Sequence, residues 1–337
     1  MKVPLEPHYR QRYYELLEET FDSGFLSEGR MVERFENRFG EFVCGLNAAA
    51  VSNCGMGLLS VLEFLGVRGY EVIMPSNTFM ATPLAARHAG AEVVYADCNR
   101  EDLCLSLEDL KKRITRRTKA VILVHIGGHL AFQSREIADF LAEREIALIE
   151  DCAHAHGASW NGRAAGSFGV AGVYSFYATK TMPLGEGGMV VTSSSELDLW
   201  VHKYRNYGKF EYKIPGMNCR MNEVTAALGL VQMERLPMIL DWKRALAEKY
   251  DRIFDNRVRL PEGMASGYYK YIVFDTDVME KTGAVFDRLC HEIENVRADL
   301  PNSEWVRDHH SCPPIYFGWE GSELSEETLF SRLIGNK

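Results

Sequence analysis

The segment "KAVILVHIGGHLAFQSREIADFLAEREIALIED", residues 119–151, contains two short apolar runs separated by a helical pattern. The runs at 119–125 and 146–151 have the length and the β-branched content of buried strands. Residues 134–146, between them, carry apolar side chains at helical spacing. A strand, a helix and a second strand in this order predict two parallel strands joined by a crossover helix.

The same alternation continues on both sides of this unit, which predicts an α/β fold. Strands that are buried on both faces read as continuous apolar runs, and helices between them cover a mostly parallel central sheet. Ligands of such sheets bind beyond the carboxyl ends of the strands, so side chains at those ends are the first candidates for chemistry. The further strand-like runs lie at 48–53, 70–75, 91–97, 171–176 and 188–193, and the further helical patterns at 55–66 and 78–90.

The pattern changes after Gly216, and it predicts a second, smaller domain. Residues 221–254 form a long helical stretch, which we expect to be interrupted near Pro237. The run "YYKYIVFDT" further on reads as one strand of an α+β domain. We therefore expect an N-terminal segment and a large cofactor-binding domain in residues 1–240, and a small C-terminal domain in residues 241–337.

Composition argues against several classes of protein. A net charge of −9 disfavours a nucleic-acid partner or an anionic membrane surface. No stretch approaches the ~20 apolar residues that a membrane helix needs, and the first residues lack the apolar core of a signal peptide. The eight cysteines are scattered without a CxxC pair, so we expect reduced thiols and a cytoplasmic protein without a membrane partner.

Two strand ends carry groups that suit an anion and a flat ring. Asn53 is a good N-cap, and the amides of Cys54 and Gly55 then point out of a helix start, where a phosphate can bind. The ordinary alternative is a glycine turn that serves packing alone. Phe79 follows the strand at 70–75 and could stack on a flat ligand or lie in the core.

Two further strand ends carry an acid and an amine. Asp151 ends the strand at 146–151, where a buried carboxylate needs a cationic or donor partner, such as a protonated ring nitrogen or an arginine. Ser175 lies at the end of the strand at 171–176, and Lys180 follows five residues later. Lys180 could be a surface residue, or in a partly dry site an amine with a lowered pKa that acts as nucleophile and base. Taken in order, these groups are what pyridoxal phosphate needs.

The chain resembles the DegT/DnrJ/EryC1/StrS family of sugar aminotransferases, which have the aspartate-aminotransferase-like fold type I of pyridoxal-phosphate enzymes. The resemblance covers most of the chain, and its blocks follow in family order. It implies a pyridoxal-phosphate-dependent fold with a mostly parallel central sheet, flanking helices and a smaller α+β domain. The blocks are "DSGFLSEGRMVERFENRFGEF", "AVSNCGMGLLSVLEFLG", "PSNTFMATPLAARHAGAEVVYADC", "VHIGGH", "EDCAHAHGA", "GSFGVAGVYSFYATKTMPLGEGGMVVT" and "GMNCRMNEVTAALGLVQMERL".

The resemblance also assigns roles to single residues. It makes Lys180 the Schiff-base lysine and Asp151 the partner of the pyridine nitrogen. Phe79 would stack on the ring, and His154 would lie near the ring and its phenolic oxygen. Asn218 would reach the cofactor phosphate of a neighbouring subunit, which implies a homodimer with shared active sites. The phosphate would be bound by Ser175 and the amides of Cys54 and Gly55.

The implied reaction moves an amino group from an amino acid, L-glutamate by family analogy, to a keto-sugar. The acceptor would be a nucleotide-linked 4-keto- or 3-keto-6-deoxyhexose, and the product an amino sugar for a surface polysaccharide or a natural product. A keto-cyclitol is the alternative acceptor. The candidates for binding the nucleotide diphosphate are cationic, although each could also belong to a solvated loop: Arg30, Lys203, Arg205 and Arg220.

Two departures from the family pattern bear on the site. The phosphate loop has Asn-Cys-Gly-Met where the family commonly has Ser-Gly-Thr-Ala, so a threonine hydroxyl is missing and the loop amides must do more. The C-terminal end matches the family loosely, and that end is where residues that select the sugar often lie.

Three other classes of protein compete with the aminotransferase. A metal-dependent hydrolase would use histidines near the strand ends, although their spacing matches no known zinc motif and we expect no metal. A dinucleotide oxidoreductase would need a complete glycine fingerprint, which is absent. A non-catalytic relative of the fold is the third. The histidines in question are His125, His129, His154 and His156.

Overall fold

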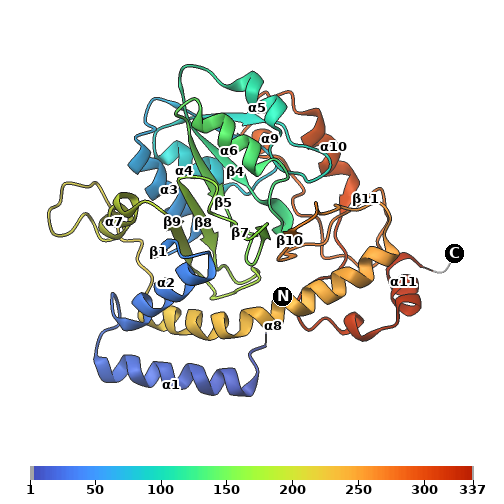
Figure 1. Cartoon of the computed structure of the whole chain (residues 1–337), viewed down its shortest axis with the longest axis horizontal. Coiled ribbons are helices and arrows are strands. Elements are labelled where there is room, and N and C mark those ends of the chain that lie inside the picture. The colour runs from blue at the N-terminus through green and yellow to red at the C-terminus, as the bar shows by residue number, and fades with distance from the viewer. Residues whose placement is uncertain (1–3, 336–337) are drawn as a thin grey trace.

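The computed structural model describes residues 4–335. It is built around a seven-stranded sheet, with helices on both sides (Figure 1). Strand β9 pairs antiparallel with both β1 and β8, and the other neighbouring strands are parallel. All seven strands predicted for the central sheet are present, which confirms the mostly parallel α/β fold. In spatial order they are β1 (Asn47–Val51), β9 (Gly188–Thr192), β8 (Ala171–Ser175), β5 (Ala147–Asp151), β4 (Thr118–Val124), β2 (Glu71–Pro75) and β3 (Glu92–Ala96).

Two hydrophobic cores cover the two faces of the sheet. Side chains alternate along a strand, so neighbouring residues of β8 belong to different cores: Val173 to one and Tyr174 to the other. Tyr174 packs edge-on against Phe39, with 4.9 Å between ring centroids. On the opposite face a Cβ on Gly57 would lie 2.6 Å from a methyl of Val173, so this glycine allows its helix to approach the sheet closely.

The helices around the sheet occur where the apolar periodicity placed them. The predicted patterns at 55–66, 78–90 and 134–146 correspond to α3, α4 and α6, each within a few residues at its ends. The helices of this part of the chain are α2 (Arg30–Phe42), α3 (Cys54–Leu65), α4 (Ala81–His88), α5 (Leu107–Arg113), α6 (Ser134–Ala142) and α7 (Ser195–Tyr204), with the 3-10 turn η1 (Ile126–Gly128).

Two long helices run along one edge of the molecule, α1 (Pro7–Ser23) and α8 (Glu223–Ile253) (Figure 1). The predicted interruption at Pro237 was wrong, because α8 continues through this residue. A proline inside a helix loses one backbone hydrogen bond. Here the neighbouring Leu236 and Leu240 are buried, so apolar packing on both sides of the proline holds the two halves in line.

The C-terminal part has its own apolar core, around Tyr250 and Trp319. The predicted strand at 268–276 is shorter than expected, because its first residues bond to the turn at Gly127 rather than to a strand. Residue 240 lies inside α8, so the two-domain division stays a prediction. The elements are β6 (Ser159–Trp160), β7 (Arg163–Ala164), β10 (Met264–Ala265), β11 (Val273–Phe274), α9 (Cys290–Ile293), α10 (Pro301–His309), β12 (His310–Ser311), η2 (Glu320–Glu323) and α11 (Glu326–Ile334).

Within residues 4–335, no helix is both long and apolar enough to cross a bilayer.

Candidate active site

Asp151 ends β5 with a buried carboxylate that has three neutral donors, of which the Cys54 thiol at 3.9 Å is the most distant. Its side chain accepts hydrogen bonds from the Thr82 hydroxyl at 3.0 Å and the Ala153 amide at 3.1 Å. Burial raises the pKa of Asp151, and these two hydrogen bonds oppose the effect. No arginine or lysine forms an ion pair with Asp151 in residues 4–335, so the arginine alternative finds no support. A protonated ring nitrogen would supply the missing positive charge.

Lys180 follows β8 in a turn that its amide closes by bonding to the Tyr177 carbonyl at 2.9 Å. Its side chain is half-buried, and Nζ lies 4.7 Å from the centroid of the Tyr269 ring. Burial lowers the pKa of Lys180 to about 8, while the charge of Asp151 acts in the opposite direction. Over the described residues the amine has no hydrogen-bond or ion-pair partner, so Nζ is available to react.

The start of α3 and the end of β8 lie close together through Gly188, and we call this pair of segments the cradle. Asn53 caps α3 by accepting from the Met56 amide at 2.9 Å, as predicted. Ser175 pairs with Gly188 across β8 and β9, and a Cβ on Gly188 would lie 2.5 Å from the Asn53 carbonyl carbon. The end of β8 at Ser175 therefore lies beside the positive end of α3, where the amides of Cys54 and Gly55 begin the helix. This arrangement suits a phosphate.

Phe79 and His154 lie on segments that adjoin this cradle. The Phe79 side chain is 78% exposed, so it is not a core residue, and its carbonyl accepts from the amide of Thr82, whose hydroxyl bonds to Asp151. The Nδ1 atom of His154 accepts a hydrogen bond from the Gly127 amide at 3.4 Å. Burial, followed by the charge of Lys180, lowers the pKa of His154 well below its usual value, so the ring is neutral with its hydrogen on Nε2.

Tyr269 is a site residue that the sequence analysis did not single out. Its ring stacks on His154 with 4.0 Å between centroids, and its hydroxyl lies 3.4 Å from the Thr179 hydroxyl. The segment is fixed because Lys270 donates its amide to the Gly127 carbonyl, and a Cβ on Gly128 would lie 2.4 Å from the Tyr269 nitrogen. Gly128 has φ of 107°, so the glycine pair in "VHIGGH" was the signal that another chain segment approaches here.

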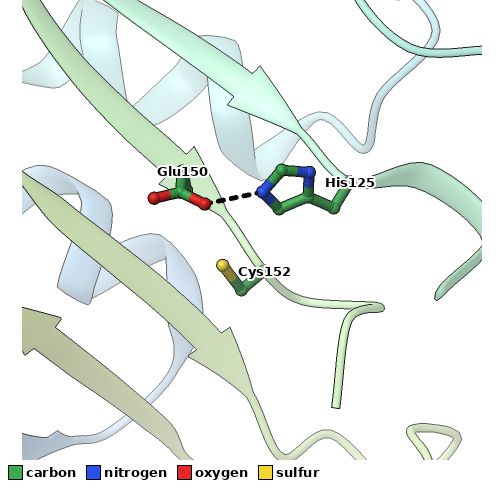
Figure 2. Close-up of side chains that lie close together, drawn as sticks. All are labelled: His125, Glu150 and Cys152. Atoms are coloured by element: carbon green, nitrogen blue, oxygen red, sulfur yellow. Dashed lines mark hydrogen bonds and ion pairs between the residues drawn. The ribbon is translucent and has the colours of Figure 1, made fainter. Parts of the chain in front are cut away.

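Two of the three side chains that could form a metal site, His125 and Glu150, are bonded to each other and to backbone amides. His125 bonds through Nε2 to Glu150 at 2.8 Å, and Cys152 lies beside them (Figure 2). The other ring nitrogen of His125 accepts from the Ala131 amide at 3.1 Å. Glu150 also accepts three backbone amides, from Gly166, Phe168 and Gly169. This carboxylate is a structural anchor for a loop, and its lone pairs are already used.

The other predicted metal ligands do not converge with these. His129 bonds through Nε2 to the Asp102 carbonyl at 2.9 Å. His156 is fully buried between Tyr174 and Phe176. In the part of the chain that the structure describes, no arrangement of these histidines supports the metal-hydrolase alternative.

Three of the four candidate substrate cations are already paired. Arg205 is buried and bonds to Glu36 and to the Ala50 carbonyl. Lys203 pairs with Glu211 at 2.8 Å. Arg220 pairs with Glu28 at 2.9 Å and bonds to Asn218, which is exposed. Arg30 is exposed at the first residue of α2 and has no ion pair within residues 4–335.

A cavity of about 770 Å³ lies between α1 and α2, away from the strand ends. Its lining includes Arg30 and Arg205 together with acidic side chains such as Glu28, Glu36 and Glu223, and none of the residues around Lys180. We place the chemistry at the strand ends, because that is where the unpaired amine and the buried carboxylate lie.

The fold and the strand-end groups define a class, the pyridoxal-phosphate-dependent aminotransferases of fold type I. The model of the DegT/DnrJ/EryC1/StrS aminotransferase family matches residues 7–266. The chain belongs to this family, and its cofactor is pyridoxal phosphate, as predicted.

Relatives and solved structures agree with this assignment. The chain is 36% identical over 252 residues to GDP-perosamine synthase of Vibrio cholerae, covering 73% of this chain and 68% of that protein. It is 34% identical over 275 residues to dTDP-3-amino-3,4,6-trideoxy-alpha-D-glucose transaminase of Micromonospora megalomicea, covering 77% and 73%. The aminotransferase TlmJ from Streptoalloteichus hindustanus superposes with a TM-score of 0.86 at 30% identity, covering 99% of this chain and 95% of that one.

Proposed function

We propose that this protein transfers an amino group from an amino acid, L-glutamate in our assignment, to the keto group of a nucleotide-linked 6-deoxyhexose. The observation that carries the proposal is the unpaired Lys180 amine next to the buried Asp151 carboxylate, at the carboxyl end of the sheet. The acceptor class is supported by the relatives, which include synthases and transaminases of GDP- and dTDP-linked amino sugars. A keto-cyclitol acceptor is less favoured.

The residues at the strand ends fit pyridoxal phosphate. Asp151 would keep the ring nitrogen protonated, which matches a buried carboxylate that forms no ion pair within residues 4–335. Ser175 and the amides of Cys54 and Gly55 would hold the phosphate, and Phe79 would cover one ring face. When bound, the cofactor supplies a carbonyl carbon for amine exchange and a ring that accepts electrons.

Lys180 has two roles in this proposal, and both depend on its amine. It would hold the cofactor covalently in the resting enzyme, and it would carry the proton that must be moved during transfer. A pKa of about 8 leaves a useful fraction of Nζ neutral near pH 7.5, so the amine can accept and return that proton.

His154 would act as a hydrogen-bond donor near the cofactor. Because its Nδ1 accepts from the Gly127 amide, the hydrogen is on Nε2, which can donate to the phenolic oxygen. Its stack on Tyr269 holds the ring in one orientation.

The proposal includes a homodimer in the cytoplasm with shared active sites, where Asn218 would donate to the cofactor phosphate of the partner subunit. Exposed apolar side chains near this residue favour a protein interface. They are Phe25, Leu26, Met217 and Val224. We also propose that the third apolar core marks the small domain.

An absorption spectrum tests the cofactor and the first half-reaction. Purified wild-type protein reconstituted with pyridoxal phosphate should absorb in the visible range, and L-glutamate should bleach this band. Lys180→Ala should lose or shift the band, whereas Lys119→Ala, which changes an exposed lysine, should behave as wild type. The absence of a band in wild-type protein supplied with the cofactor would refute the proposal. Keto-sugar nucleotides and keto-cyclitols are then compared as acceptors that restore the band.

Mixed dimers test the shared site. Equal amounts of Lys180→Ala and Asn218→Asp protomers are unfolded together, refolded and assayed at limiting cofactor. Random pairing of two defective chains restores one intact site in half of the dimers, about a quarter of the wild-type sites. If each site lies within one chain, mixing restores nothing.

A further inference from the structure

The polar residues around Asn218 determine which side of its amide faces outward. This inference rests on the proposed function, in which Asn218 meets the cofactor phosphate of the partner subunit. An asparagine amide offers two N–H donors on one side and an oxygen acceptor on the other. A phosphate accepts hydrogen bonds, so only the donor side is useful to it.

Arg220 fixes the orientation of the Asn218 amide. Its Nε lies 3.1 Å from Oδ1 of Asn218, and its backbone amide lies 3.5 Å from the same oxygen. A guanidinium can only donate, so the asparagine must turn its oxygen toward Arg220. The Nδ2 hydrogens then point away from Arg220, and the Asn218 residue is exposed.

Glu28 in turn holds Arg220 in place. Its Oε2 accepts from Nη1 of Arg220 at 2.9 Å, and both carboxylate oxygens accept from Nδ2 of Asn206, at 2.7 and 2.9 Å. Asn206 and Asn218 are partners in an isolated antiparallel bridge. One carboxylate therefore contacts both sides of the loop that carries Asn218.

The backbone conformation fixes the position of Glu28 beside Arg220. Glu28 has φ of 54°, a left-handed conformation that a non-glycine residue adopts only when its surroundings favour it. The next residues are held by the buried carboxylate of Glu223, which accepts from the amides of Gly29, Met31 and Val32 at 2.8 to 3.1 Å. The position of Glu28 is therefore fixed from the start of α8.

We propose that Glu28 and Arg220 are positioning residues, which orient the Asn218 amide so that its two N–H donors face the cofactor phosphate of the partner subunit. Arg220 acts through Asn218 in this arrangement rather than on the substrate. Charge-assisted hydrogen bonds connect Glu28 to Arg220 and Arg220 to Asn218. The series ends at the two N–H donors of the Asn218 amide, and Asn218 is exposed.

Cofactor affinity measures this role without any turnover. Apoprotein is titrated with pyridoxal phosphate to obtain the dissociation constant, and the phosphorus NMR shift of the bound phosphate is recorded. Asn218→Ala should weaken binding by about tenfold or more, because a buried phosphate contact is lost. Glu28→Ala should weaken it by about three- to tenfold, because the amide is no longer held in one rotamer, and should move the phosphorus shift in the same direction. Glu28→Gln keeps an acceptor for Arg220 and should retain most of the affinity.

A matched control and a double variant separate positioning from general damage. Glu33→Ala removes an exposed carboxylate of α2 that has no ion pair in the described residues, and should bind as wild type. If Glu28 acts through Asn218, Glu28→Ala combined with Asn218→Ala binds no more weakly than Asn218→Ala alone.

Three outcomes would overturn the inference. The first is a full additional loss in the double variant, and the second is wild-type affinity in Glu28→Ala while Asn218→Ala is impaired; both leave the proposed function intact. The third is an Asn218→Ala variant that binds as wild type, which removes Asn218 from the phosphate and overturns the shared-site part of the proposed function as well.

Discussion

Replacing Asp151 with asparagine tests the proposed site most directly, because it changes one charge and almost no volume. Asp151 is 5% exposed, and the hydroxyl and amide that contact it could stay in place around an asparagine. In the enzyme with bound cofactor, the carboxylate would be half of a buried ion pair with the ring nitrogen. Removing one partner of such a pair costs ~3–5 kcal/mol. At ~1.36 kcal/mol per decade, this corresponds to roughly two to four decades in the rate at which glutamate bleaches the visible band.

The assay is a stopped-flow measurement of that bleaching in Asp151→Asn with saturating cofactor. Asp139→Asn is the matched control, because it neutralises an exposed aspartate on α6 and should keep the wild-type rate. A rate in Asp151→Asn within tenfold of wild type, with the cofactor bound, would refute the reasoning. The buried carboxylate would then have to serve the fold rather than the ring nitrogen.

Three further predictions follow from the site geometry. The rate at which apoprotein recombines with pyridoxal phosphate should rise about tenfold per pH unit below the Lys180 pKa of about 8 and level off above it, because burial lowers this pKa and only the neutral amine attacks; a flat profile from pH 6 to 9 contradicts this. Gly128→Ala should lower the thermal midpoint and slow the half-reaction, since a Cβ would lie 2.4 Å from the Tyr269 nitrogen, and normal values for both would refute that contact. Glu150→Ala should lower the free energy of unfolding by ~3 kcal/mol or more in chemical denaturation, because it leaves buried donors, His125 among them, unpaired. A metal chelator should change neither the stability nor the activity of the wild-type protein. A loss of stability or activity with the chelator would restore the metal hypothesis.

The sequence predicted the sheet well because each strand can be recognised from its own few residues. Strands buried on both faces appear as continuous apolar runs, and the residues at their ends follow from the chain itself. Asp151, Ser175 and Asn53 were found in this way, and the structure places all three at strand or helix ends. Parallel strands bring such ends to one edge, so the neighbourhood of the site could be inferred without knowing any contact.

Contacts between distant segments could not be read in the same way. Tyr269 lies 115 positions from His154 in the numbering, yet their rings stack. The glycine pair at 127–128 is typical of a place where another part of the backbone lies close, but it does not identify residues 268–269 as that part. Arg205 was a candidate because cations cluster around it in sequence, and the structure instead buries it against Glu36. Clustered charges in a sequence do not show which of them remain free of ion pairs after folding.

The altered phosphate loop illustrates how both kinds of information combine. Because the threonine hydroxyl is missing, the sequence made Cys54 a candidate through its backbone amide. The structure directs the Cys54 sulfur toward the sheet, 3.9 Å from an Asp151 oxygen and 3.7 Å from the Val173 carbonyl. Burial, and then the charge of Asp151, raise the pKa of this thiol well above its usual value, so the side chain stays neutral and inside. In the proposed site Cys54 can therefore offer the phosphate only its backbone amide, and the hydroxyl contribution must come from Ser175.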